Sequence, residues 1–349
     1  MSRSAGKLSN GRVARLPAAS DESMTDTNPT PDPSTDPQTD GDTLRIDTVE
    51  RLCTDIERNV ADVIVGHEDA VEHVVTALLG RGHVLLEDVP GVGKTMLARS
   101  IARSVDCSFS RVQFTPDLLP TDVTGVNVFN QKTREFEFQP GPVFGNIVLG
   151  DEINRAPPKT QAALLEAMEE EQVTTDGETR ELPTPFTVIA TQNAVEPNRT
   201  YELPFAEVDR FMKKLHLGYP NPDEEAELLG RTVGDHPIES LESVTDRETL
   251  VAARETVSTV RVAEPVREYV TRLAADTREN AHIGVSPRGT ISLLRAAQAR
   301  AVTNGREYVT PDDVETEARV VLSHRIKTNS RDRDGLAVVE DALERVPVE

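Results

Sequence analysis

The sequence predicts an α/β protein in which helices cover a parallel sheet and a small all-helical domain follows. Short apolar segments alternate with helical periodicity between residues 47 and 191, which favours a parallel sheet. One of these segments, residues 83–87, leads directly into a glycine-rich loop and then a helix. Beyond residue 222 only helical periodicity recurs.

Length and charge limit the possible functions. The 349 residues are enough for one large or two ordinary domains. Sixty acidic against 38 basic residues give a net charge of −22, which disfavours binding to nucleic acid. The acidic excess is spread along the chain and the basic residues are mostly arginine, which indicates adaptation to high salt. A moderately acidic mesophilic protein is the alternative.

Cysteine content and hydropathy favour a cytoplasmic protein. Cys53 and Cys107 are the only cysteines, and because no apolar signal core precedes them we expect both to be reduced core residues. No apolar run approaches the ~20 residues that span a bilayer, so we expect no membrane insertion.

Composition and periodicity divide the chain into four regions. Residues 1–42 are rich in Ser, Thr, Pro, Asp and Gly and are predicted to be a disordered tail, with Met24 as an alternative start where the basic composition turns acidic. The remaining regions are an α/β core over 43–218, a helical lid domain over 219–328 and a charged, partly ordered end over 329–349.

The expected elements follow from the apolar spacing. In the core we expect helices from residue 47, over 70–79, after the glycine-rich loop and over 159–169, and strands at 83–87, 111–114, 146–149 and 186–191. In the lid domain we expect helices at 223–231, 247–258, 265–279, 287–303 and 311–323.

A phosphate-binding loop follows the first strand. A strand, a glycine-rich loop and a helix place backbone N–H groups and a helix N-terminus around phosphates. Lys94 would contact the β- and γ-phosphates of ATP, and the Thr95 hydroxyl would hold Mg²⁺. The candidate nucleotide-binding residues here are Pro90, Gly91, Val92, Gly93, Lys94, Thr95 and Met96.

The loop departs from the usual pattern at one position. Asp88 occupies the place where G-x-x-x-x-G-K-[ST] begins with glycine. We expect its side chain to point away from the phosphates, because an inward carboxylate would weaken nucleotide binding.

Polar residues follow two further strands. The apolar strand 146–149 leads into Asp151 and Glu152, which suit Mg²⁺ binding through water and the orientation of an attacking water. A solvated Asp-Glu turn is the alternative. Asn193 follows the strand at 186–191, where its amide would contact the γ-phosphate or that water, although Asn after a strand is commonly a turn residue.

With these motifs, the sequence resembles the MoxR family of AAA+ ATPases over roughly residues 47–323. The resemblance is carried by RVQFTPDLLP at 111–120, DEINRAPPKTQ at 151–161, ATQN at 190–193 and LPFAEVDRF at 203–211. It implies a P-loop core with a helical lid.

The resemblance also implies roles for single residues. Asp151 and Glu152 match the Walker B pair, Asn193 the sensor-1 residue, Arg210 the arginine finger and Arg288 sensor 2.

Local sequence supports the two arginine assignments unevenly. Ser286, Pro287 and Arg288 suit the N-cap, N1 and N2 positions of a helix. For Arg210, a surface ion pair with Asp209 or Glu207 is an equal alternative on the residues alone. Arg155 is a further candidate for action across an interface.

Two other segments receive expectations from the family. Val65 and Gly66 match the segment that packs against adenine, although His67 stands where the family usually has Gln. Residues 172–182 predict a hairpin with an Asp-Gly turn, an insertion that the family directs towards the centre of its hexamer.

These features predict an ATP hydrolase that uses ATP and Mg²⁺, forms a homo-oligomeric ring, expected to be a hexamer, and remodels or matures client proteins. By resemblance, a von Willebrand factor A-domain protein is one possible partner. The alternatives are a nucleotide-gated scaffold with slow turnover, and a chelatase-type or nucleic-acid-associated AAA+ motor subunit.

Overall fold

The computed structural model describes residues 43–193, 201–231, 237–329 and 333–348. The tail expected to be disordered, residues 1–42, lies outside these ranges.

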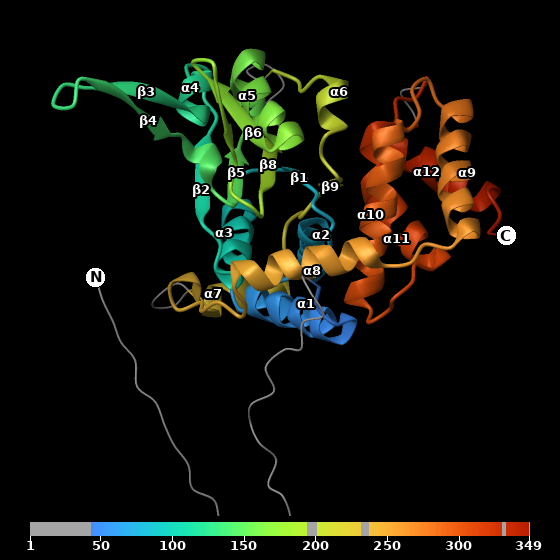
Figure 1. Ribbon diagram of the computed structural model, residues 1–349. Helices are drawn as coiled ribbons and strands as arrows, with labels where there is room; N and C mark the ends of the chain where they lie inside the picture. Colours follow the sequence, from blue (N-terminus) through green and yellow to red (C-terminus); the bar gives the residue numbers. More distant parts are fainter. Residues whose placement is uncertain (1–42, 194–200, 232–236, 330–332, 349) are drawn as a thin grey trace, which may run out of the picture. The chain divides into compact units, whose positions relative to one another are not determined.

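Five parallel strands form the central sheet in the order β2-β5-β8-β1-β9 (Figure 1). Their bounds are β1 Val84–Asp88, β2 Phe109–Gln113, β5 Ile147–Asp151, β8 Thr187–Asn193 and β9 Lys213–Leu215. The sequence predicted the first four. The fifth, β9, has three residues and pairs with β1 in the register Val84 to Lys213.

Helices cover both faces of this sheet, which confirms the α/β prediction. Val84 and Leu86 of β1 pack among α1 (Ile46–Ala61), α2 (Glu68–Leu79) and α3 (Lys94–Ser104). Leu85, between them, belongs to the other core cluster with α5 (Pro158–Glu170). Successive side chains of a strand point to opposite faces, so the continuous apolar runs of the sequence are explained by burial on both sides.

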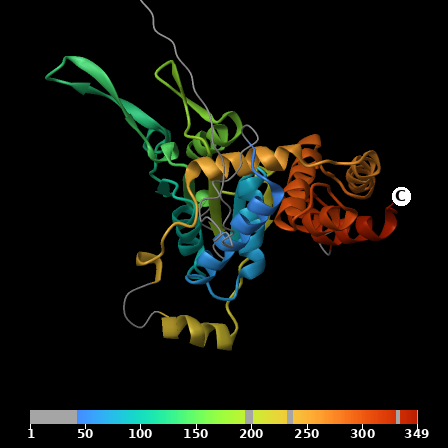
Figure 2. The same ribbon diagram turned by 60° about the horizontal axis from the view of Figure 1, so that its bottom comes forward.

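Two antiparallel hairpins extend from the core (Figures 1 and 2). The hairpin β6 (Gln172–Thr175) and β7 (Glu178–Glu181) has the predicted turn, with Asp176 and Gly177 both at positive φ. The hairpin β3 (Gly125–Asn130) and β4 (Glu135–Pro140), which follows the short helix α4 (Pro120–Thr124), was not predicted. The Asn127 amide donates to the Asp176 carboxylate at 2.8 Å and joins the two hairpins.

In the part of the chain that the structure describes, the five helices predicted for the lid segment are present and a sixth follows them. They are α7 Pro222–Arg231, α8 Arg247–Thr259, α9 Glu264–Asn280, α10 Pro287–Thr303, α11 Pro311–Leu322 and α12 Gly335–Arg345. The sequence predicted a charged, partly ordered end where the structure has α12. This helix is ordered by packing on α9 and α11, with Val338, Val339 and Ala342 buried.

Short helical segments complete the described chain. They are Pro142–Phe144, Ile153–Arg155, α6 Phe205–Val208, Pro237–Glu239 and Ser323–Arg325.

Buried ion pairs join the lid helices to the sheet. Lys213 Nζ of β9 lies 2.7 Å from Glu317 Oε2 of α11, and both side chains are fully buried. Arg300 Nε of α10 donates to the other Glu317 oxygen at 2.7 Å. Burial opposes ionisation of Glu317, but the neighbouring cations outweigh it, led by Lys213, and hold its pKa well below the ordinary value.

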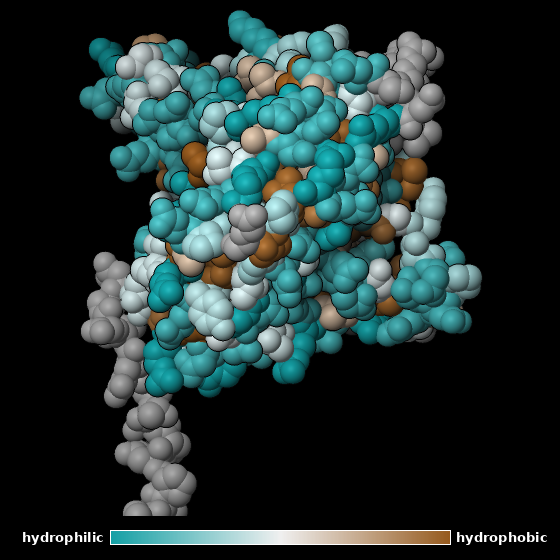
Figure 3. Space-filling view, turned by 90° about the vertical axis from the view of Figure 1, so that its right-hand side faces the viewer, coloured by the Kyte–Doolittle hydropathy of each residue, from teal (hydrophilic) through white to brown (hydrophobic). Residues whose placement is uncertain are grey.

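The cysteines and the surface agree with the composition. Cys53 is buried, Cys107 is partly buried and both are free. Figure 3 shows a predominantly hydrophilic face with small, separated hydrophobic patches. Across the described ranges, no helix combines the length and apolar character needed to cross a membrane.

His83 connects the start of β1 to two neighbouring elements and gives a pH-dependent term in stability. Val188 N donates to His83 Nδ1 at 3.0 Å, so Nε2 carries the proton and donates to Met168 O at 3.1 Å. Burial lowers the pKa of His83 from 6.5 to about 4.

We predict that His83 destabilises the fold on acidification. Above pH 6.5 the neutral buried imidazole makes its full contribution to the free energy of unfolding. This contribution is lost as the pH falls towards 4, because the unfolded chain binds the proton at a higher pH than the folded chain. Between pH 7 and 4 the wild type should lose about 3 kcal/mol more than His83→Gln in denaturant unfolding. The exposed His282→Gln should behave as the wild type; equal pH slopes for wild type and His83→Gln would contradict the assignment.

Candidate active site

The carboxyl ends of four parallel strands meet at one edge of the sheet. Asp88 at the end of β1 is in register with Asn193 of β8, and Gln113 of β2 with Asp151 of β5. A cavity of about 300 Å³ lies at this edge. It is lined by Pro90, Gly91, Gly93, Lys94, Thr95, Met96, Arg111, Gln113, Asp151, Glu152 and Asn193.

The glycine-rich loop adopts a conformation that requires glycine at two positions. Gly91 and Gly93 have φ of 91° and 92°, in the left-handed region. A Cβ at either position would contact nothing within 4 Å, so the requirement is conformational, not steric. The loop leads into α3, whose first residue is Lys94, and this combination of a concave loop and a helix N-terminus fits a phosphate group.

Lys94 lies against the loop that carries it. Its Nζ donates to the carbonyl oxygens of Asp88 at 3.1 Å and Val89 at 3.2 Å. Burial lowers the pKa of Lys94, and the nearby carboxylates partly oppose this shift.

Asp88 is directed out of the cavity, in the orientation expected from the sequence. Its Oδ2 accepts hydrogen bonds of 2.7 Å from the N–H groups of Leu217 and Gly218, and its Oδ1 accepts one from Val89 N. Burial opposes ionisation, but these donors and Lys94 outweigh it, so the pKa of Asp88 lies below the ordinary value. The carboxylate therefore connects the phosphate loop to the segment that leaves β9.

Asp151 is buried and held on both oxygens. Thr191 Oγ1 donates to Oδ1 at 2.7 Å, and Arg111 donates to Oδ2 through NH2 at 2.5 Å. These contacts fix the carboxylate at the cavity beside Thr95, so the donor set fits a hard divalent cation such as Mg²⁺.

Glu152 is fixed by both its backbone and its side chain. Its φ of 56° is uncommon for a residue with a side chain, a form of strain that concentrates at functional sites. Its N–H donates to Thr191 Oγ1 at 2.8 Å. Its Oε2 accepts from Gln113 Nε2 at 2.8 Å and from Arg155 NH1 at 2.7 Å.

The sequence assigned no role to Arg111, Gln113 or Thr191. The first two occupy alternate positions at the carboxyl end of β2, so they share one face beside β5. Thr191 lies on β8, on the other side of β5. Their polarity at strand ends was a usable signal, but their partners depend on strand order.

Three of the predicted nucleotide-binding residues do not line the cavity. They are Val65, Gly66 and Val92. Val92 is buried. Gly66 has a φ of 78°, and a Cβ there would come within 2.4 Å of the Glu224 carboxyl group, so its loop meets the start of α7.

Arg210 and Arg288, the predicted arginine finger and sensor 2, also lie outside this cavity and close to each other. Arg210 NH2 is 3.2 Å from Glu169 Oε2. The ion pair of Arg210 is therefore with Glu169, whereas the sequence offered Asp209 or Glu207 as the alternative partner. Arg288 also forms an ion pair with Glu169. The N-cap prediction is confirmed, since Ser286 Oγ accepts from Gly289 N at 3.1 Å.

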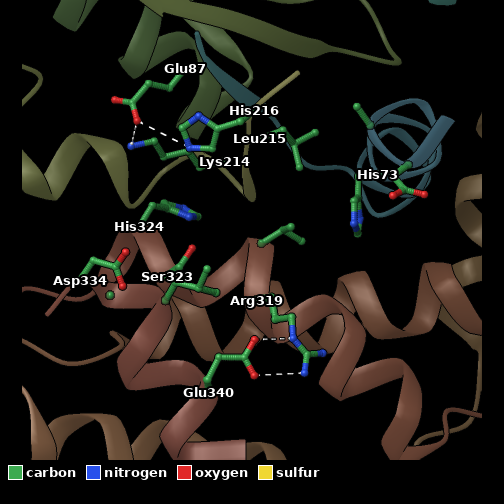
Figure 4. A pocket seen from close by; sticks show the side chains of 15 residues that line it. His73, Glu87, Lys214, Leu215, His216, Arg319, Ser323, His324, Asp334 and Glu340 are labelled. Atoms are coloured by element: carbon green, nitrogen blue, oxygen red, sulfur yellow. Dashed lines mark hydrogen bonds and ion pairs between the residues drawn. The ribbon is translucent and has the colours of Figure 1, made fainter. Parts of the chain in front are cut away.

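A larger cavity, of about 620 Å³, lies beside β9 and faces the lid helices α11 and α12 (Figure 4). Its cations already have partners, with Lys214 Nζ 2.6 Å from Glu87 Oε2 and Arg319 Nε 2.7 Å from Glu340 Oε1. None of the predicted site residues lines it. The smaller cavity around Lys94 is therefore the candidate active site.

Comparison with known proteins identifies the family of the chain. Residues 83–213 match the model of the ATPase family associated with various cellular activities (AAA), and residues 273–346 match the AAA lid domain. The chain is 40% identical to the chaperone MoxR1 of Mycobacterium tuberculosis, over 82% of this chain and 78% of that protein. It belongs to the MoxR family of AAA+ ATPases.

Other relatives cover most of the chain. The YeaC protein of Bacillus subtilis is 50% identical over 82% of this chain and 91% of its own length. The crystal structure of an ATPase described as putative, from Cytophaga hutchinsonii, superposes with a TM-score of 0.81 at 36% identity, over 87% of this chain and 97% of that one. This MoxR-family chain therefore has an AAA+ core followed by a helical lid.

We predict that Thr191→Val weakens binding of Mg²⁺ and ATP together. The change is nearly isosteric but removes the hydroxyl that bonds both Asp151 and the Glu152 backbone, so the Mg²⁺ concentration for half-maximal nucleotide binding should rise about tenfold. Titration of a fluorescent ATP analogue with Mg²⁺ measures this. Thr191→Ser retains the hydroxyl and should bind nearly as the wild type; equal loss in both variants would assign the effect to packing.

Proposed function

We propose that this MoxR-family chain hydrolyses ATP at sites shared between neighbouring subunits of a ring and uses the cycle to remodel client proteins. The observation that carries the proposal is the separation of Lys94 from Arg210 and Arg288 within one chain.

The sheet topology sets this separation. β1 and β9 are parallel, with Val84 opposite Lys213. Lys94 follows the carboxyl end of β1, whereas Arg210 lies just before the amino end of β9. The five residues of β1 span about 13 Å at ~3.3 Å per residue, so the two cations belong to opposite edges of the sheet. If Arg210 or Arg288 completes the pocket around Lys94, it would therefore do so from another subunit.

The residues at the cavity suit phosphoryl transfer to water. Thr95 and Asp151 would hold Mg²⁺, which supplies neutralisation of phosphate charge. Glu152, held by Gln113 and Arg155, would orient and polarise a water. Asn193 lines the same cavity from β8, and its amide would contact the γ-phosphate or that water.

A contact that presents the arginine edge of one subunit to the phosphate edge of the next is heterologous, and repeating it gives a ring when the rotation between subunits closes. The family supports a hexamer. The hairpins β3-β4 and β6-β7 project from the core and offer surfaces for clients. A chaperone-like role is supported by the relative named chaperone MoxR1, and a von Willebrand factor A-domain protein is one candidate partner.

We predict that Glu152→Gln binds ATP but hydrolyses it at least about a hundredfold more slowly. The amide retains the shape of the side chain but cannot polarise water. Phosphate release measures turnover, and equilibrium binding of labelled ATP measures affinity, which should change less than about threefold. Glu170→Gln, at an exposed glutamate of α5, is the control. Persistent turnover in Glu152→Gln would remove this residue from the mechanism.

We predict that Arg210→Ala loses at least about a hundredfold in ATPase rate and regains activity when mixed with Lys94→Ala. The first variant keeps its pocket and the second keeps its arginine, so random mixing restores about a quarter of the interfaces. The assay is phosphate release against mixing ratio, with each variant alone as the control. A mixture no more active than its components would contradict action in trans.

A further inference from the structure

Glu169 binds both arginines that the proposed function assigns to the neighbouring site. Arg210 NH2 lies 3.2 Å from Glu169 Oε2, and Arg288 NH2 forms an ion pair with Oε1, so each carboxylate oxygen takes one guanidinium group. Glu169 belongs to α5, Arg210 to the segment before β9 and Arg288 to the lid helix α10. One carboxylate therefore connects three separate parts of the chain.

Further contacts hold the two guanidinium groups beside each other. Arg210 NH1 donates at 2.5 Å to the carbonyl oxygen of Leu165, one turn before Glu169 in α5. Ser286 Oγ, at the start of the helix that carries Arg288, donates to the carboxylate of Asp209 at 2.8 Å. Asp209 directly precedes Arg210, so both arginines are fixed at the junction of core and lid.

This cluster is accessible to an external ligand. The side chains of Arg210, Glu169 and Arg288 are 26%, 35% and 44% exposed. By contrast, the ion pair between Lys213 and Glu317 is fully buried and can only be structural. Exposed pairs of this kind are weak individually, so a ligand of higher negative charge can displace the carboxylate.

A phosphate and Glu169 compete for the same two guanidinium groups. Arginine binds carboxylate and phosphate through the same fork of N–H donors. A γ-phosphate held by both arginines would lie next to the Glu169 carboxylate, and like charges at that distance repel, most strongly where a subunit interface excludes water. Binding of the phosphate therefore requires release of at least one arginine from Glu169.

We propose that Glu169 is an intrachain competitor of the neighbouring subunit's nucleotide. It holds Arg210 and Arg288 together and releases them to a phosphate group on the adjacent subunit. Glu169 is a positioning residue, since it acts through the arginines, and it sets the protein concentration at which shared sites form. This inference rests on the trans role of the arginines proposed above.

The test compares Glu169→Gln with the wild type and with Glu170→Gln. Loss of the charge weakens both ion pairs, so the protein concentration for half-maximal ATPase activity per subunit should fall roughly three- to tenfold, while the rate at saturating protein is not lowered. Thermal unfolding verifies that the variant is folded. A higher protein concentration for half-maximal activity, or a lower ATPase rate at saturating protein, would show that Glu169 supports the arginines and would overturn the competitor role.

A second experiment identifies the route of the effect. ATP-dependent assembly is measured by analytical ultracentrifugation in the Glu152→Gln background. The added Glu169→Gln should lower the assembly midpoint in that background and leave it unchanged when Arg210→Ala and Arg288→Ala are also present. An equal shift with and without the arginines would overturn the inference. Failure of the proposed trans site itself is separately visible, because Arg210→Ala would then not be rescued by Lys94→Ala.

Discussion

The parallel pairing of the central strands constrains the positions of the candidate site residues in this chain. The carboxyl ends of parallel strands, and the loops that follow them, lie at one edge of a sheet. Asp151, Asn193 and the phosphate loop are therefore close together. The segment before β9 necessarily lies at the other edge, and α5 returns the chain there after β5. Glu169 and Arg210 meet because of this return. A chain built in this way has the pocket around Lys94 at one edge of the sheet and Arg210 at the other.

Buried ion pairs join the core to the lid helices. Arg325 is buried and donates to Asp209 Oδ1 at 2.8 Å, while Lys213 and Arg300 neutralise Glu317. Separating such pairs would leave a charge without a partner in a dry environment, which is strongly unfavourable. Motion of the lid helices away from β9 is therefore unfavourable. Arg288, at the start of the lid helix α10, would then keep its position relative to β9.

The sequence predicted those features that are encoded locally. The parallel strands have continuous apolar runs, and Lys94, Thr95, Asp151 and Glu152 follow strands directly. The three residues of β9 are too few to show periodicity. The hairpin β3-β4 does alternate apolar and polar residues, in GVNVFN and EFEFQP, but most of these side chains are not buried, so the alternation does not mark a core strand. In α12, charged neighbours obscured a small apolar stripe. The same limit applies to the site, because Arg111 and Thr191 contact Asp151 only through strand order and register, which the sequence does not contain.

The functional charges share one property, which is that each already has a partner within the chain. Asp151 is paired with Arg111, Glu152 with Arg155, Lys94 with loop carbonyl groups, and the arginines of the opposite edge with Glu169. Such pairing keeps partly buried charges from being isolated. It also means that a bound nucleotide replaces contacts that these residues already make within the chain, so the net gain in free energy at each residue is small. The free energy of nucleotide binding must then come from several such exchanges together.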